Sequence, residues 1–243
     1  MLFTKVKPTK GDLMRKLTKT FIVSLTLCIA FTIWGIIPES IIGKGSLGNV
    51  TTAIQTALVS KFGWFYIISV SIILGVSIFL IVSKYGSIRL GKDDDEPDYS
   101  YMTWFAMLFS AGMGIGLVFW GVAEPLNHLY APPFGDSATE ESARLALRFS
   151  FFHWGLHPWG LYAFVALCIA YFTFRKGKAS TISATVGPLF KGGDHGRIAH
   201  LFDVLAVFAT VFGVATSLGL GAKQIAGGVS YLTSIPNSLT TQL

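Results

Sequence analysis

Five long apolar stretches constrain this chain more than any other feature. They cover approximately residues 21–37, 64–82, 102–126, 145–174 and 198–232. A helix needs about 20 mostly apolar residues to cross the hydrocarbon core of a bilayer, and each stretch approaches or exceeds that length. The 243 residues are 52% hydrophobic and 13% charged, with a mean hydropathy of +0.59 that no ordinary soluble domain shows. We therefore expect an all-α integral membrane protein with one membrane domain over residues 21–243.

The basic residues are sorted by connection, which predicts how the chain is oriented. Six of them lie in residues 1–20, and further groups lie between the second and third stretches and between the fourth and fifth. The other two connections carry few. In membrane proteins, basic residues concentrate in cytoplasmic loops, which is called the positive-inside rule. This rule predicts a basic cytoplasmic tail over residues 1–20 and spans that alternate in direction. This pattern explains the net charge of +6 better than binding to nucleic acid does.

The third stretch contains the segment SAGMGIGLVFWGVAEP, Ser110 to Pro125, with four glycines within ten residues. Each glycine lowers the stability of a helix by about 1 kcal/mol relative to alanine, so this helix is predicted to be interrupted. Unwound backbone in a membrane must face protein or a water-filled cavity, because lipid offers no hydrogen-bond partners. The segment is therefore a candidate ligand site. A small-residue face for close helix packing, formed by Gly112 and Gly116, is the alternative.

The fourth stretch contains the segment FSFFHWGLHPWGLYAF, which predicts a kinked helix. Pro158 cannot donate a backbone hydrogen bond and clashes with the preceding turn. Gly155 and Gly160 flank it and weaken the helix further. We expect a kink at Pro158 that exposes backbone groups at membrane depth.

A continuous helix through this segment would place its aromatic side chains on one face. Trp154, Trp159 and Tyr162 would share that face, and His153 and His157 would lie on the opposite one. Aromatic faces suit a quaternary ammonium, which has no N–H to donate, at about 2 kcal/mol for each desolvated contact. A packing or interface role for the aromatic face is the alternative. The histidine pair has the spacing of metal ligands, as in a membrane metalloenzyme.

The fifth stretch presents a stripe of small and hydroxylated residues. Thr210, Gly213, Val214, Ser217 and Gly221 fall within one 100-degree arc of a helix. Such a stripe could pack on the interrupted third helix. Its hydroxyl groups could ligate a small cation or bond back to their own helix, and the pattern does not separate these two roles.

Three runs in these stretches carry a resemblance to a known family. The runs AMLFSAGMGIGLVFWGVAEP, FHWGLHPWGLYAF and TVFGVATSLGLGA are similar to those of the betaine/carnitine/choline transporter family, and the similarity covers nearly the whole chain. The resemblance implies a twelve-helix fold around two inverted five-helix repeats of the LeuT type. This chain would supply the two leading helices and the first three helices of the first repeat. We therefore expect an N-terminal part of a transporter, apparently truncated at Leu243.

The resemblance also implies roles for individual residues. It implies substrate-binding roles for Gly112, Met113, Gly114, Ile115, Gly116, Trp154, Trp159 and Tyr162. It implies sodium ligands at Ser110, Met113 and Thr210. Val214 stands where some members carry a second threonine, which removes one hydroxyl ligand. Gly116 stands where choline-type members carry an aspartate, which favours a zwitterionic betaine, and the GMGIG run favours sodium coupling.

The function expected from this resemblance is sodium-coupled symport of glycine betaine or a related quaternary-ammonium compatible solute, which serves osmoprotection. The expected location is the bacterial inner membrane. Expected partners are the solute, sodium as coupling ion and the lipid bilayer, with a homotrimer left open and no further cofactor or catalytic residue. The alternatives are a same-family carrier of choline, carnitine or ectoine/proline, a metalloenzyme using His153 and His157, and a non-transporting membrane subunit.

Overall fold

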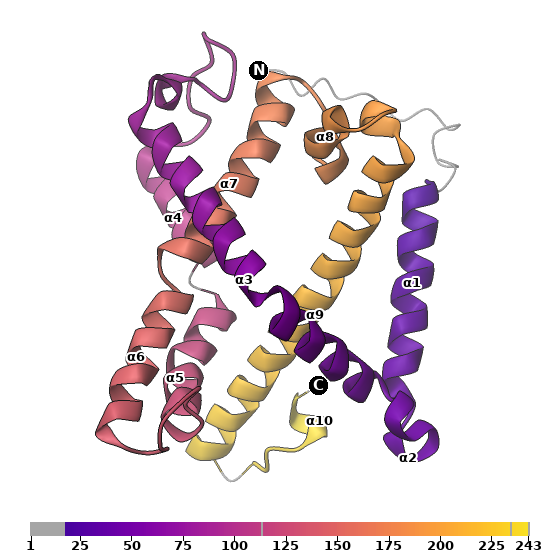
Figure 1. Ribbon diagram of the computed structural model, residues 1–243, viewed down its shortest axis with the longest axis vertical. Coiled ribbons are helices and arrows are strands. Elements are labelled where there is room, and N and C mark those ends of the chain that lie inside the picture. Colours follow the sequence, from indigo (N-terminus) through magenta and orange to yellow (C-terminus); the bar gives the residue numbers. More distant parts are fainter. Residues whose placement is uncertain (1–17, 113, 234, 243) are drawn as a thin grey trace.

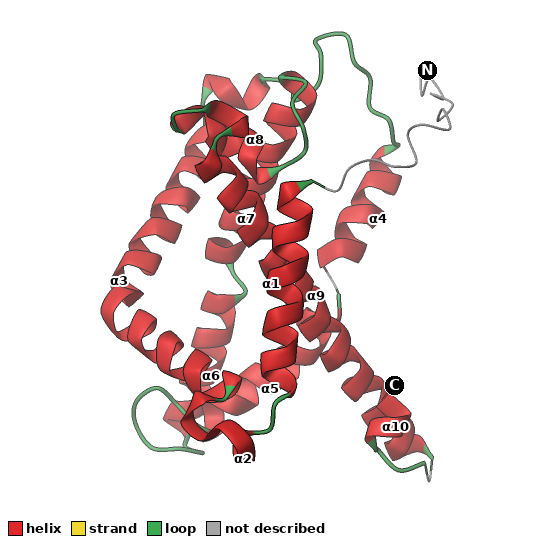
Figure 2. Cartoon of the chain, turned by 90° about the vertical axis from the view of Figure 1, so that its right-hand side faces the viewer, coloured by secondary structure: helices red, strands yellow, loops and turns green. Residues whose placement is uncertain are grey.

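The computed structural model describes residues 18–112, 114–233 and 235–242, and within these ranges the chain forms helices and no strand (Figures 1 and 2). The α-helices are α1 (Lys19–Ile36), α2 (Glu39–Ile42), α3 (Leu47–Val82), α4 (Tyr101–Gly112), α5 (Ile115–Tyr130), α6 (Glu140–His153), α7 (Leu156–Ala170), α8 (Ile182–Val186), α9 (Arg197–Leu232) and α10 (Leu239–Gln242). This confirms the prediction of an all-α protein.

Four helical stretches of the described chain are long and apolar enough to cross a membrane: Lys19–Ile36, Glu39–Val82, Glu140–Arg175 and Arg197–Leu232. The third predicted span is divided between α4 and α5, which have 12 and 16 residues and are each short of a full crossing. Four of the five predicted apolar stretches therefore lie, to within one residue, in these long helical stretches, and the remaining one is divided between α4 and α5. The chain is a multi-pass membrane protein.

The second long helix begins earlier than the apolar pattern indicated. Helix α3 starts at Leu47, although the predicted span starts at residue 64. The side chain of Ser46 caps the helix by accepting from the backbone N–H of Asn49 at 3.4 Å. No proline follows this cap, and the polar Thr and Gln residues there are compatible with a helix even though they lower its hydropathy. Hydropathy therefore located the span and missed the start of the helix.

Aromatic rings hold the first and last long helices together. The ring of Phe31 on α1 lies 5.1 Å from that of Phe208 and 4.9 Å from that of Phe212, both on α9. Their edge-to-face geometry is the favourable arrangement for such pairs. Helix α9 covers the fifth apolar stretch and is unbroken over 36 residues. At 1.5 Å per residue it is about 54 Å long, so it must tilt or extend beyond the bilayer.

Helices α3 and α7 approach each other closely at a glycine. Gly160 on α7 is buried, and a Cβ atom added there would lie 2.9 Å from Cδ1 and 3.4 Å from Cα of Leu74 on α3. The Ser77 hydroxyl also donates to the carbonyl oxygen of Gly160 at 3.4 Å. Small residues allow this kind of backbone approach between membrane helices. Gly160 thus packs α7 on α3 and does not kink its helix.

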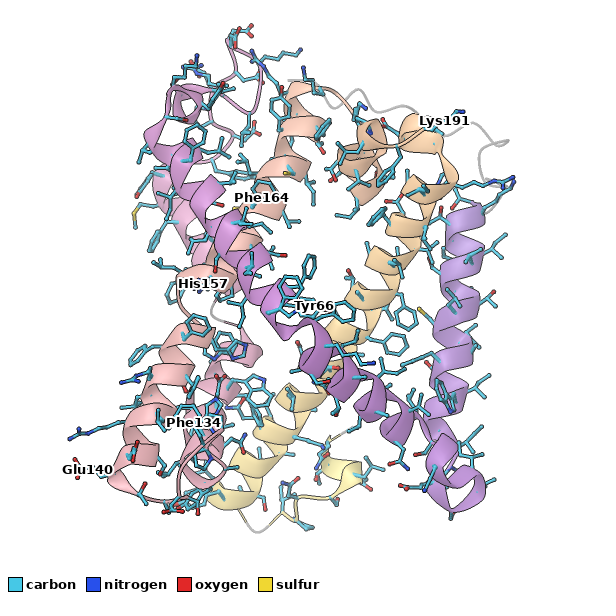
Figure 3. The ribbon with its side chains drawn as sticks, viewed as in Figure 1. Tyr66, Phe134, Glu140, His157, Phe164 and Lys191 are labelled. Atoms are coloured by element: carbon cyan, nitrogen blue, oxygen red, sulfur yellow. The ribbon has the colours of Figure 1, made fainter. Side chains whose placement is uncertain are left out.

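The connections that carry the basic groups lie at one end of the molecule. Figure 1 shows the start of α1, the α3–α4 connection and the α7–α9 connection at the same end. Lys191 lies at this end, and Glu140 lies at the opposite end (Figure 3). Arg175, at the end of the fourth span, binds the α3–α4 connection. It donates to Asp93 Oδ1 at 2.6 Å and to the carbonyl oxygen of Gly91 at 2.8 Å. The hydrogen bond and charge of Arg175 lower the pKa of the Asp93 carboxyl.

Replacing Gly160 by valine should destabilise the protein, because the added side chain collides with Leu74 and forces α3 and α7 apart. We expect a loss of about 1–3 kcal/mol, the usual cost of overpacking. The measurement is thermal unfolding of the purified complete protein in detergent. Gly75→Val on α3 is the matched control, since nothing lies within 4 Å of a Cβ atom there. Equal effects of the two substitutions would contradict this account of the contact.

Replacing Arg175 by glutamine should return the pKa of Asp93 toward its ordinary value of 3.8. Because folding lowers this pKa, the contribution of Asp93 to stability is present above 3.8 and is lost as the pH falls through the lowered value. The measurement is titration of the Asp93 carboxyl carbon by NMR, with Lys84→Gln in the same connection as control. An Asp93 titration that Arg175→Gln leaves unchanged would remove Arg175 as the cause.

Candidate functional site

The third span is interrupted at the glycine run. Helix α4 ends at Gly112 and α5 begins at Ile115, while Met113 lies outside the described residues. Gly114 precedes α5 in an extended conformation with φ −74° and ψ −178°, and no side chain caps the helix there. This confirms the predicted interruption. The first N–H groups of α5 are therefore left to partners outside the helix.

The fourth span is also interrupted, but four residues before the predicted kink. Helix α6 ends at His153 and α7 begins at Leu156, with Trp154 and Gly155 between them. A Cβ atom added at Gly155 would lie 2.5 Å from the carbonyl oxygen of Phe151, so this backbone path requires glycine. Pro158 lies in the first turn of α7, where a missing N–H costs no bond within the helix. The prediction of a kink at Pro158 was wrong for this reason.

This break also overturns the predicted helix faces. A continuous helix would set His153 opposite Trp154, yet the two side chains converge on Glu124 of α5. His157 lies beyond the break near the junction of α6 and α7 (Figure 3), and its ring is 4.9 Å from that of Phe152. The two histidines therefore do not form the pair that an unbroken helix would create.

The two breaks meet at one contact. A Cβ atom added at Gly112 would lie 3.0 Å from Cη2 of Trp159, so the indole of α7 rests against the end of α4. The Trp159 N–H donates to the carbonyl oxygen of Trp154 at 3.1 Å. The Trp159 and Tyr162 rings lie 6.0 Å apart at 66°. Three predicted substrate-binding residues, Gly112, Trp159 and Tyr162, are thus brought together.

Trp154 is joined to this group through its carbonyl oxygen, whereas the described chain shows no such contact for the other predicted residues. Gly114 and Gly116 have open space where a Cβ atom would be. Ser110 lies on α4, all of whose side chains from Tyr101 to Ser110 are exposed, and Figure 2 shows this helix standing apart from α3. Thr210 is exposed on α9. Sodium binding by Ser110, Met113 and Thr210 stays a prediction.

Sequence reasoning missed the most buried acid of this region. Glu124 on α5 is only 6% exposed. One carboxylate oxygen accepts from the Trp154 indole N–H at 2.7 Å, and the two oxygens lie 2.8 and 2.9 Å from Nδ1 of His153. His128 Nε2 lies 3.6 Å from the carboxylate. The available signal was an ionisable residue inside an apolar stretch, which is rare in membranes and by default functional.

The metalloenzyme alternative finds no support. In the described part of the chain, no three His, Cys, Asp or Glu side chains are grouped so that they could hold a metal ion. His153 is engaged with Glu124, and His157 lies against Phe152.

Comparison with known proteins gives a consistent picture. The family model described as BCCT, betaine/carnitine/choline family transporter, matches residues 19–243. The glycine betaine transporter OpuD of Bacillus subtilis is 48% identical over 232 residues, which are 95% of this chain and 44% of that relative. The ectoine/hydroxyectoine transporter of Virgibacillus pantothenticus is 47% identical over 184 residues, covering 75% of this chain and 36% of the relative. Glycine betaine transporter 1 of Vibrio parahaemolyticus is 47% identical over 190 residues, which are 76% of this chain and 36% of that relative.

These relatives are named for transport and not for catalysis. The chain spans less than half of the length of each of them. The family match covers both interrupted spans and the helices that pack on them. This chain belongs to the betaine/carnitine/choline transporter family.

Proposed function

We propose that this chain works in a sodium-coupled symporter of glycine betaine or a related quaternary-ammonium solute. The location we propose is the bacterial inner membrane, with the N-terminus in the cytoplasm. The observation that carries the proposal is the contact between Gly112 and Trp159, because it joins the glycine-broken backbone of one span to the aromatic pair of another. This juxtaposition offers both surfaces that a betaine requires.

A betaine has a trimethylammonium group at one end and a carboxylate at the other. The ammonium group has no N–H, so the faces of Trp159 and Tyr162 suit it better than hydrogen-bond acceptors would. The carboxylate suits the uncapped N-terminus of α5, which carries free N–H groups and a partial positive charge. Gly114 and Gly116 leave room for the solute to approach the backbone.

The proposed aromatic site is open on one side. Trp159 is 45% exposed and Tyr162 is 66% exposed, so these two rings alone cannot enclose a cation. Trp154 completes the group in the proposal, although its indole N–H is already engaged by Glu124. We propose that further residues of the complete protein close the site, and that the chain alone does not transport. A homotrimer stays open as the assembly.

Sodium would act as the coupling ion and not as a cofactor. We propose that the backbones of Ser110 and Met113 hold one ion near the break between α4 and α5, and that Thr210 lies near a second. The membrane potential supplies about 2.3 kcal/mol per charge for each 100 mV, in addition to the concentration gradient. Coupling requires that sodium bind the substrate-ready conformation better than its alternative.

Ectoine is the second candidate substrate, because a relative named as an ectoine/hydroxyectoine transporter is 47% identical over 75% of this chain. Ectoine lacks a quaternary ammonium, so the aromatic pair favours glycine betaine. Competition separates the two: excess unlabelled ectoine should inhibit betaine uptake weakly, and excess betaine strongly.

The direct test is uptake of labelled glycine betaine by cells that lack other betaine carriers. The cells would express either the complete reading frame that encodes this chain or residues 1–243 alone. We expect uptake from the complete frame in sodium buffer and a large loss in potassium buffer, since sodium supplies the work. Equal uptake in both buffers would contradict sodium coupling. No uptake by properly inserted protein would contradict the substrate or the class of function.

Replacing Trp159 by alanine should weaken transport by raising the KM for betaine. Loss of one desolvated cation–π contact of about 2 kcal/mol corresponds to roughly thirtyfold. Trp104→Ala is the matched control, since Trp104 on α4 is 47% exposed and lies beside Tyr101, away from the two breaks. A KM that Trp159→Ala leaves at the wild-type value would remove Trp159 from the site.

A further inference from the structure

Glu124 is an acid that the proposed transport cycle does not yet use. It lies inside an apolar stretch and is almost fully buried. A buried charge without partners is very unfavourable, so such a group is kept only where it is paired and hydrogen-bonded. Its partners are ring nitrogens of His153, Trp154 and His128, at 2.8, 2.7 and 3.6 Å. The carboxylate is therefore held in one orientation.

Two of the partners of Glu124 lie at the break in the fourth span. His153 is the last residue of α6, and Trp154 is the first residue after it. The carboxylate thus ties α5 of the third span to the point where the fourth span loses its helical hydrogen bonds. A charged acceptor makes the stronger class of hydrogen bond, which suits it to fixing this turn.

A short path leads from this carboxylate to the proposed substrate site. Glu124 accepts from the indole of Trp154, and the carbonyl oxygen of Trp154 accepts from the indole of Trp159 at 3.1 Å. The ring of Trp159 then rests against Gly112. Each step is a direct contact, so the position of Trp154 sets the position of Trp159.

We propose that Glu124 is a positioning residue for the substrate site, which holds Trp154 and thereby sets the Trp159 ring against the broken third span. This inference rests on the proposed function, since the site it positions is the betaine site. Glu124 acts through the two tryptophans and does not touch the substrate.

A purely structural role, holding α5 to α6, would predict something different. These helices have other contacts: the ring of Phe149 on α6 lies 5.6 Å from that of His128 on α5 and 6.0 Å from that of Phe134, which follows α5. Leu145 and Ala146 of α6 are buried as well. The helix pair should therefore survive loss of the carboxylate, while the turn at Trp154 should loosen.

The experiment compares three variants of the complete reading frame in betaine uptake. Glu124→Ala and Trp154→Phe remove the same hydrogen bond from its two ends, and each should raise KM about tenfold, as expected for a bond to a charged group. Glu124→Gln keeps an acceptor oxygen and should restore most of the affinity. Glu140→Gln is the control, since that side chain is 81% exposed and pairs with Arg144 on the surface of α6. Membrane abundance and Vmax are measured for all four.

Hydrogen-exchange mass spectrometry adds a measurement that does not depend on transport. In purified Glu124→Ala, exchange should rise over residues 150–160 and near Gly112, and should stay at the wild-type level over residues 140–149. An unchanged KM with lower abundance or Vmax would overturn the positioning role, as would unchanged exchange at the break. Absence of betaine uptake by the wild type, together with the expected exchange pattern, would refute the proposed function while still showing that Glu124 holds the turn at Trp154.

Discussion

Backbone that leaves a helix inside a membrane must find other partners, and this requirement organises the structure. Lipid supplies none, so two interrupted spans are tolerated only where they meet each other or enclose a polar cavity. The breaks after Gly112 and at Gly155 meet through Trp159, whose indole N–H satisfies the carbonyl oxygen of Trp154. The same arrangement leaves the N-terminus of α5 without a side-chain cap and sets the Trp159 and Tyr162 rings 6.0 Å apart. The proposed ligand site is thus a consequence of how the two breaks meet.

A buried carboxyl group, that of Glu124, also stabilises the break in the fourth span. Glu124 is buried beside the break in the fourth span, where its carboxyl oxygens face ring nitrogens from α5, α6 and the turn after α6. Such a group is too costly to be retained without partners. Far from the breaks, the packing is ordinary: aromatic edges join α1 to α9, and Gly160 lets α7 approach α3. The buried polar contacts of Glu124 therefore lie where the regular helix is interrupted.

Much of this could be predicted from sequence because it depends on local chemistry. The glycine run at Gly112–Gly116 weakens its own helix, and hydropathy alone marked α1, α7 and α9. The break in the fourth span was misplaced because proline is harmless in a first turn, whereas Gly155 is required by the carbonyl oxygen of Phe151. That contact exists only once the chain is folded.

Other parts of the site depended on residues distant in sequence. Two partners of Glu124, His153 and Trp154, lie about thirty positions further along in another span, and an assumed continuous helix placed them on opposite faces. The family resemblance implied that Gly112 and Trp159 both bind the substrate, but no spacing rule could show that these two residues touch. The sequence pattern around the proposed sodium ligands on α4 and α9 does not predict that they lie together either, and the described chain brings them into no shared contact.

The central claim is that the two breaks form one site through the contact of Gly112 with Trp159. A double-mutant cycle on the betaine Kd of the purified complete protein tests it most directly. Gly112→Val should weaken binding strongly in the wild type, because the new side chain displaces the Trp159 ring. In a Trp159→Ala background the same substitution should have little further effect. Additive losses, each independent of the other residue, would contradict the claim that the contact builds the site.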